Sequence, residues 1–294
     1  MEARPESPRA GLAAALGAFL IWGLSPLFWA RLRSVDSFEV LAHRILWSSV
    51  LAGLVLAFTR EGFAPLGRLR DPRVAGVMLL STALIAVNWF VFIWAVQHDR
   101  VTEVSIGYYT NPLYNVLLGR VVLQEKIGGR RALAVLLAGI GVAVLAASLD
   151  TIPWVSLSLA LSFGTYGLVR KLAPMAALPG LMIETTLWAP FCLAYLVLGI
   201  DPAGGAALQR PATLPLLIAG GAVTASPLLL FAVGARRLPY STLGMLQYLA
   251  PTLQLGLAVF VFGETFTPTH ALTFGCIWAA VALYATGGPG RRTP

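Results

Sequence analysis

Hydrophobic residues gather along this chain in ten long, continuous runs separated by short polar segments. The runs cover residues 11–30, 38–59, 74–96, 102–124, 131–148, 152–169, 179–199, 213–235, 240–263 and 268–286. Most approach the length of about 20 residues that a helix needs to cross a bilayer. Strands of a membrane barrel would alternate apolar and polar side chains, which these runs do not do. The pattern therefore predicts an all-α integral membrane protein with ten transmembrane helices.

Composition strengthens this prediction, because 57% of the 294 residues are hydrophobic and only 12% are charged. Soluble domains carry about 25% charged residues, so the missing charge indicates a surface that contacts the lipid bilayer. The first run resembles a signal peptide, but it continues to Ala30, and bulky Phe28 and Trp29 do not suit a cleavage site. We expect it to be retained as the first helix.

The net charge of +8 is distributed unevenly between the two sides of the predicted bundle. With the N-terminus inside, 15 of the 21 lysines and arginines lie in inner segments and four in outer loops. Basic residues prefer the cytoplasmic side of a membrane, so both termini are predicted to be cytoplasmic. This distribution explains the positive charge without a nucleic-acid partner.

The second half of the chain repeats the polar, proline-containing run at 101–125 after a shift of 139 residues. The shift pairs Tyr109 with Tyr248, Pro112 with Pro251, Asn115 with Gln254 and Glu125 with Glu264. Five helices per half place the second half in the opposite orientation. The sequence thus predicts two inverted five-helix repeats, residues 1–149 and 150–294.

Polar and aromatic residues in the middle of these runs are the candidates for a solute-binding cavity between the halves. They are Trp22, Asn88, Trp89, Tyr108, Asn111, Asn115, Tyr166, Gln247 and Gln254. Pro112 and Pro251 each remove a helix hydrogen bond, which predicts helix breaks near this cavity. Amides and aromatic rings suit a small amphipathic or zwitterionic solute. The alternative is that the amides only hydrogen-bond neighbouring helices.

Four ionisable residues lie inside the predicted spans and are candidates for gating or proton linkage: Glu39, His43, Arg44 and Glu184. A shift of 141 residues carries His43 onto Glu184, so a titratable group is expected near each side. The alternative is that Arg44 extends outward to pair with Glu39 while His43 is merely hydrogen-bonded. Glu125 and Glu264 end their runs, where a structural role at the membrane boundary is favoured.

Motifs of enzymes, metal sites and nucleotide sites are missing from the sequence, so no cofactor or metal is expected. Cys192 and Cys276 lie in apolar runs and are predicted to pack there as small apolar side chains. The Gly220–Gly221 pair lies in a predicted helix and favours close helix packing.

Three stretches carry a resemblance to a known family: EVLAHRILWS at 39–48, residues 88–119, and residues 236–266. Together with SFGTYGLVRK at 162–171, they resemble the EamA group of the drug/metabolite transporter superfamily and, within it, the RarD family. The resemblance extends from about residue 11 to 284 and departs at Tyr108–Tyr109–Thr110, where a phenylalanine-rich variant is expected. It implies a bacterial inner-membrane permease with a central cavity that opens alternately to each side. The family residues matched are Glu39, His43, Arg44, Trp47, Asn88, Trp89, Tyr109, Asn111, Pro112, Asn115, Gln247, Tyr248 and Pro251.

The leading prediction is a secondary transporter that moves a small organic metabolite or drug by alternating access. The alternative is a membrane-embedded enzyme or lipid-handling protein, for which Glu39, His43 and Arg44 are the one local group of suitable side chains. Proton coupling is an open possibility, whereas the solute, the direction of transport and the oligomeric state are not indicated.

Overall fold

The computed structural model describes residues 8–32, 34–97, 101–147, 154–198, 213–261, 263 and 268–286, and its regular elements there are all helical. In chain order they are α1 (Pro8–Trp29), η1 (Ala30–Leu32), α2 (Ser37–Ala57), η2 (Ala64–Arg70), α3 (Pro72–Gln97), α4 (Val101–Val121), α5 (Gly129–Ala146), α6 (Trp154–Leu172), α7 (Ala177–Val197), α8 (Thr213–Arg237), α9 (Tyr240–Gln247), α10 (Leu249–Phe260) and α11 (Pro268–Thr286). Each of the ten predicted runs contains helix, with ends within three residues of those expected.

The ninth run forms two helices, α9 and α10, divided at Tyr248, three residues before the Pro251 at which a helix break is predicted. Pro251 has no N–H to donate to the carbonyl of Gln247, which weakens the helix at this point. The Tyr248 N–H instead bonds to the Met245 carbonyl at 3.4 Å. The equivalent Pro112 lies inside α4, which is assigned as one continuous helix across it. The two predicted proline sites therefore differ in how far they interrupt their helices.

Five helical segments are long and apolar enough to cross a membrane: Pro8–Leu32, Phe38–Ala57, Pro72–Phe92, Ala177–Val197 and Thr213–Arg237. The segment Ala271–Thr286 is also apolar but shorter. Large apolar side chains are exposed on the outside of the bundle, among them Phe58, Phe90, Phe191 and Phe260. Such a surface suits lipid and not water, so the fold is that of a multi-pass membrane protein.

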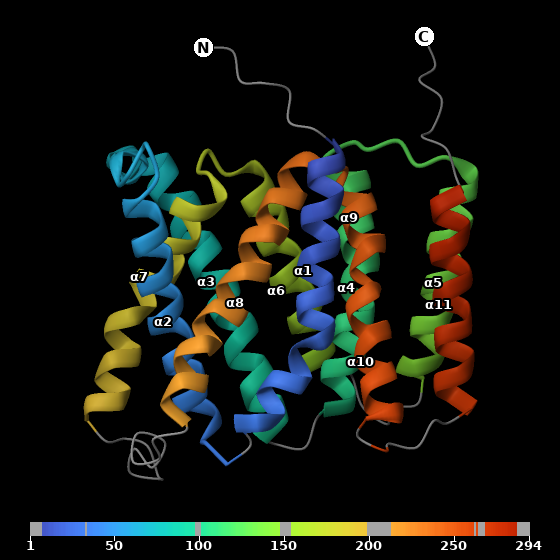
Figure 1. The fold of residues 1–294 in the computed structure, drawn as a ribbon. Coiled ribbons are helices and arrows are strands. Elements are labelled where there is room, and N and C mark those ends of the chain that lie inside the picture. The colour runs from blue at the N-terminus through green and yellow to red at the C-terminus, as the bar shows by residue number, and fades with distance from the viewer. Residues whose placement is uncertain are drawn as a thin grey trace.

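The helices stand side by side in one bundle (Figure 1). Helices α2 and α7 pack together on one flank, and α5 and α11 pack together on the other. Between them, α1 packs against α8, α3 against α6, and α4 against both α6 and α9. The centre of the bundle is therefore built from helices of both halves of the sequence.

One end of the bundle, where α1 begins and α11 ends, carries most of the described basic residues (Figure 1). We call it the basic end. Its members are Arg9, Arg60, Arg68, Arg70, Arg73, Lys126, Arg130, Arg131, Arg170, Lys171, Arg236 and Arg237. At the opposite end, α2 begins with Asp36, whose Oδ1 accepts hydrogen bonds from the backbone N–H of Phe38 and Glu39. A carboxylate there satisfies N–H groups that the first helical turn leaves without partners.

Glu125 caps the first turn of α9 at the basic end. Its carboxylate accepts hydrogen bonds from the backbone N–H groups of Tyr240 and Ser241 and from Ser241 Oγ, the last at 2.5 Å. The preceding residue, Gln124, adopts a left-handed backbone conformation with a φ of 56°, and this turn directs Glu125 towards α9. Gly263, the residue 139 positions later, has a φ of 71°. The structure thus assigns Glu125 the boundary role that its place at the end of the run predicts, whereas Glu264 lies outside the described residues.

Glycine permits the closest approach between α2 and α8. A Cβ placed on Gly221 would collide with Trp47 and with the Ser48 backbone nitrogen, and the Ser48 hydroxyl donates to the Gly221 carbonyl at 3.0 Å. The predicted packing role of the Gly220–Gly221 pair is confirmed at Gly221.

Candidate functional site

Helices α4 and α9–α10 meet at the centre of the bundle through a reciprocal pair of tyrosines. Tyr248 Oη donates to the Tyr109 carbonyl oxygen at 3.2 Å, and Tyr109 Oη donates to the Pro251 carbonyl oxygen at 3.5 Å. Both tyrosines are buried. Because the 139-residue shift relates Tyr109 to Tyr248, each half uses the same side chain to contact the backbone of the other.

Two of the predicted amides meet beside this crossing. Asn115 Nδ2 donates to Gln247 Oε1 at 2.9 Å, and both side chains are buried. Gly164 of α6 and Gly244 of α9 leave the space that Asn115 occupies, since a Cβ on Gly244 would lie 2.9 Å from the Asn115 Cβ. The amide pair therefore lies where α4, α6 and α9 approach one another.

Asn111 is one turn away from Asn115 on the same face of α4 and is 1% exposed. Among the described residues, neither its Oδ1 nor its Nδ2 finds a hydrogen-bond partner, and Asn115 Oδ1 also lacks one there. Burying an amide without a partner costs about 1–3 kcal/mol, so such groups in a native protein require an explanation. Binding of a solute or water in another conformation would supply the missing partners.

The remaining predicted cavity residues lie on several faces of the central helices. Asn88 Nδ2 donates to the Leu159 carbonyl at 3.1 Å and to Ser162 Oγ at 3.0 Å, which joins α3 to α6. Gln254 Nε2 donates to the Trp22 carbonyl at 3.1 Å, which joins α10 to α1. The Trp22 ring packs within a cluster of Phe19, Phe163 and Phe231, with centroid distances of 5.7–5.9 Å.

Tyr108 and Trp89 have aromatic neighbours outside the amide pair. The Tyr108 ring lies 6.2 Å from that of Phe92. Trp89 lines an apolar groove of about 500 Å³ between α2, α3 and α7, together with Trp188 and Phe191. A second apolar groove, of about 390 Å³, lies between α1, α2, α7 and α8. The predicted amides line neither groove, so the two grooves are separate from the amide pair.

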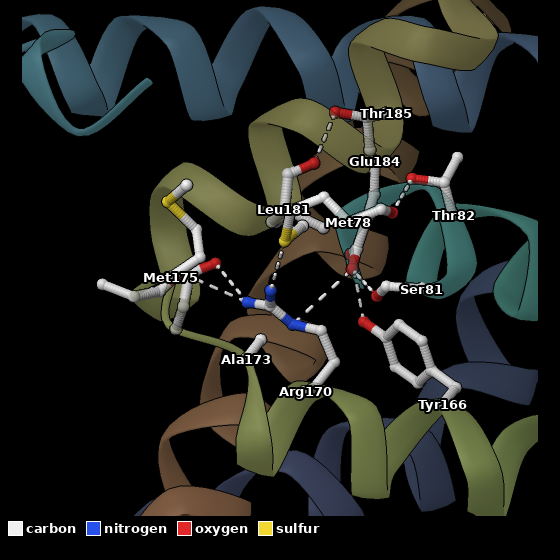
Figure 2. A network of polar contacts seen from close by, with 12 residues as sticks. Met78, Ser81, Thr82, Tyr166, Arg170, Ala173, Met175, Leu181, Glu184 and Thr185 are labelled. Carbon is white, nitrogen blue, oxygen red and sulfur yellow. Dashed lines mark hydrogen bonds and ion pairs between the residues drawn. The ribbon is translucent and has the colours of Figure 1, made fainter. Parts of the chain in front are cut away.

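Glu184 forms the densest polar cluster near the basic end, and Figure 2 shows it between Ser81, Tyr166 and Arg170. Tyr166 Oη donates to Glu184 Oε2 at 3.1 Å, and Ser81 Oγ donates to Oε1. Arg170 Nε lies 3.5 Å from Oε1, and the exposed fractions of the two side chains are 1% and 2%. The cluster therefore joins α3, α6 and α7 inside the bundle.

Arg170 was counted from the sequence as an inner-loop cation, but its guanidinium points into the bundle (Figure 2). Its Nη2 donates to the carbonyls of Ala176 and Ala177 at 3.2 and 3.1 Å. A Cβ on Gly180 would collide with the guanidinium, so glycine is needed there. The pattern RK at the end of an apolar run contains no signal that distinguishes this buried arginine from exposed basic residues such as Arg68.

Glu39, His43 and Arg44 occupy the other half of the bundle, near the start of α2. His43 Nδ1 accepts a hydrogen bond from Trp47 Nε1 at 3.3 Å, as the spacing of four residues allows. Arg44 donates from Nε to Thr224 Oγ1 at 2.9 Å and stacks over the Trp29 ring at 4.5 Å. Glu39 is 1% exposed. Arg44 thus binds α8 and α1 through these contacts.

Comparison with known proteins identifies the family. Residues 9–147 match the model of the EamA-like transporter family. The chain is 41% identical to protein RarD of Streptomyces exfoliatus over 276 residues, which covers 94% of this chain and 88% of the relative. It is 38% identical to protein RarD of Escherichia coli over 277 residues, covering 94% of each. The chain belongs to the RarD-type branch of the EamA-like transporter family.

Other relatives of this RarD-type protein agree with a transport role. A protein of Bacillus subtilis named uncharacterized transporter YojE is 44% identical over 272 residues, covering 91% of this chain and 90% of the relative. A solved structure with 18% sequence identity superposes with a TM-score of 0.71 over 98% of this chain and all of its own. That likeness supports the fold alone. The family and the names of these relatives indicate that this RarD-type chain is a membrane transporter. They favour transport over the enzyme or lipid-handling alternative.

Proposed function

We propose that this RarD-type protein is a secondary transporter that moves a small organic metabolite or drug across the bacterial inner membrane by alternating access. In this proposal the chain crosses the membrane ten times, as two inverted halves at residues 1–149 and 150–294. The fourth helix of the second half is the interrupted pair α9–α10.

The reciprocal contact of Tyr109 and Tyr248 is the observation that carries the proposal. Two equivalent residues that each bind the backbone of the opposite half are expected of a two-fold arrangement. Inverted repeats of this kind place the substrate site near the middle of the membrane, at the interface of the repeats. In such an arrangement, alternating access requires only that the contacts that close one side of the membrane be formed on the other side by the equivalent residues of the opposite repeat.

Helix packing supports the same symmetry. We exchange α1 with α6, α2 with α7, α3 with α8, α4 with α9–α10 and α5 with α11. The packed pair α1–α8 then becomes α6–α3, α2–α8 becomes α7–α3, and α4–α6 becomes the contact of α9–α10 with α1. The pairs α2–α7, α4–α9 and α5–α11 each map onto themselves. Since chance packing would not produce these matches, the pattern favours a two-fold axis between the halves.

The orientation in the membrane follows from the basic end. Lysine and arginine accumulate on the cytoplasmic side of membrane proteins, so we assign the basic end to the cytoplasm. Helix α1 begins and α11 ends at the basic end (Figure 1). In this orientation both ends of the bundle's chain path are therefore on the cytoplasmic side.

The solute class follows from the side chains at the crossing. Asn111, Asn115 and Gln247 offer amide donors and acceptors, and the Asn111 amide finds no partner among the residues that the structure describes. The aromatic rings of the Trp22 cluster come from the neighbouring helices α1, α6 and α8. Amides and rings without a fixed charge bind a small amphipathic or zwitterionic solute better than an inorganic ion.

Uptake by proteoliposomes tests the proposal. The purified full chain is reconstituted and offered a panel of radiolabelled amino acids, nucleosides and aromatic drugs, with and without a proton gradient. We expect uptake of at least one compound, and a loss of about tenfold or more in Asn115→Leu, which removes a donor at the crossing, and in Gln254→Leu, which removes the donor to the Trp22 carbonyl on α1. Leu117→Ala is the matched control, because Leu117 is on α4 but 54% exposed.

Two results would contradict the proposal. If no compound in the panel is taken up, the proposed transport cycle is refuted. If both amide variants insert and purify like the parent and show normal uptake, the proposed central binding site is refuted.

A further inference from the structure

The Glu184 cluster holds its carboxylate and its guanidinium by largely separate contacts. Arg170 Nε lies 3.5 Å from Glu184 Oε1, longer than a good charged hydrogen bond, and this Nε finds no hydrogen-bond partner within the described part of the chain. Nη2 of the same guanidinium is bound by the carbonyls of Ala176 and Ala177. If Glu184 lost its charge, Arg170 would therefore keep two strong acceptors.

Glu184 itself depends mainly on hydroxyl groups. Tyr166 and Ser81 donate to its two oxygens, one to each. A hydroxyl group donates and accepts, so Tyr166 Oη can accept the hydrogen bond of a protonated carboxyl group, which gives neutral Glu184 a partner on α6 without Ser81 of α3. The site thus offers partners to both protonation states of Glu184, which a tight bidentate ion pair would not do.

The cluster also lies where the two halves of the chain are held together at the basic end. Ser81 belongs to α3 in the first half, whereas Glu184, Tyr166 and Arg170 belong to α7 and α6 in the second. Within the second half, α6 and α8 also pack directly near this end, and Lys171 donates to the carbonyls of Ala235 and Leu238 at 2.6 Å each. Among the described residues, the two-fold counterparts α1 and α3 make at most slight contact. The asymmetry indicates a conformation closed at the basic end.

We propose that Glu184 is the proton-binding group of the transport cycle, and that its protonation releases α3 from α6 and α7 so that the basic end opens. The proposal adds a coupling ion to the alternating access proposed above and rests on it. Arg170 acts as a positioning residue, because it favours the charged carboxylate while remaining bound to the turn after α6. Charged Glu184 keeps the end closed, and neutral Glu184 lets it open.

No other charged side chain competes for this carboxylate among the described contacts. From α6 it meets Tyr166 and Arg170, and α3 presents Ser81 and the apolar Met78. The basic side chains of Arg68 and Arg236 end instead on the backbone carbonyls of residues 173–175. Helix α2 faces α7 through Ser49 and Thr186, while its titratable Glu39 and His43 lie near the opposite end.

Cysteine labelling tests the proposal without a known solute. In full-length protein carrying Cys192→Ala and Cys276→Ala, Thr82→Cys places a thiol one residue beyond Ser81, at a position that is 6% exposed. Labelling by a small water-soluble maleimide in lipid nanodiscs is followed from pH 5 to pH 8. Each rate is divided by that of the exposed reporter Arg60→Cys, which corrects for thiol ionisation.

We expect the corrected rate to rise about tenfold towards acid pH, as the population of open protein grows. Glu184→Gln should label rapidly at every pH, and Glu184→Asp should keep the pH dependence. Ser81→Ala removes a hydrogen bond that favours the charged form, so the midpoint should move up by about one pH unit. Glu61→Gln, an exposed glutamate at the same end, should behave like the parent.

The parent pH profile persisting in Glu184→Gln would overturn the proposal, as would an unchanged midpoint in Ser81→Ala. If Glu184→Gln fails to fold, the midpoint of Ser81→Ala alone decides. The two proposals fail separately. If solute is transported but the opening does not depend on Glu184, only the proposed proton switch is refuted. If the basic end opens with pH but no solute is transported, only the proposed transport function is refuted.

Discussion

Replacing Arg170 by methionine is expected to destabilise the protein far more than its place at a helix end suggests. Methionine has a similar unbranched stem, so the main loss is the guanidinium itself. Glu184 would then be a buried charge with two hydroxyl partners and no cation, and the carbonyls of Ala176 and Ala177 would lose their donor.

The magnitude follows from burial. Removing one partner of a buried ion pair costs about 3–5 kcal/mol, because the other charge remains without compensation. Arg170 and Glu184 are 1% and 2% exposed, so solvent cannot replace the lost contact. In the double variant Arg170→Met/Glu184→Gln the residual charge is also removed. The double variant should therefore lose about 2 kcal/mol less unfolding free energy than the sum of the losses in the two single variants.

Arg68→Met provides the matched control. Arg68 also donates to a backbone carbonyl at the basic end, that of Pro174 at 2.9 Å, but its side chain is exposed. Its replacement should cost less than about 1 kcal/mol. Unfolding free energies are measured by titrating sodium dodecyl sulfate into mixed micelles. If Arg170→Met costs no more than Arg68→Met, or if the two single losses simply add, the buried cluster does not have the energetic role described.

Three further substitutions test other contacts by the same unfolding measurement. Glu125→Ala removes the charged cap of α9 and should cost about 1–2 kcal/mol, with Glu61→Ala near zero; an equal effect of both would contradict the capping role. Gly180→Ala should cost about 1–3 kcal/mol because its Cβ meets the Arg170 guanidinium, and the cost should largely disappear in the Arg170→Met background. Tyr248→Phe should cost about 1 kcal/mol through loss of its bond to the Tyr109 carbonyl, whereas an unchanged stability would indicate that this bond makes no net contribution.

Sequence patterns predicted the helices well, because lipid requires every backbone group to be satisfied within its own segment. That constraint acts locally, so the apolar runs alone place the helix ends to within three residues. The break at Tyr248 was not predicted at its position. Pro112 and Pro251 have the same local chemistry, yet α4 continues and the other run divides. The difference depends on what each helix packs against, which periodicity does not contain.

The candidate site was predicted as a set of residues but not as a set of contacts. Asn111 and Asn115 share a face of α4, but among the described residues Asn115 finds a partner, Gln247, and Asn111 does not. Tyr166 was predicted to line the cavity, and the structure adds that its hydroxyl donates to Glu184, a contact that the sequence did not indicate. Whether these residues bind a solute stays a prediction that the transport assays above address.

The sequence by itself determined that this chain is helical, that it belongs in a membrane and which family it belongs to, because each of these follows from local composition and pattern. Only the tertiary structure decided that Arg170 turns inward to Glu184 and that Glu125 caps a helix more than a hundred residues away. The direction and pairing of a polar side chain depend on its neighbours in space, which are supplied here by helices distant in the chain.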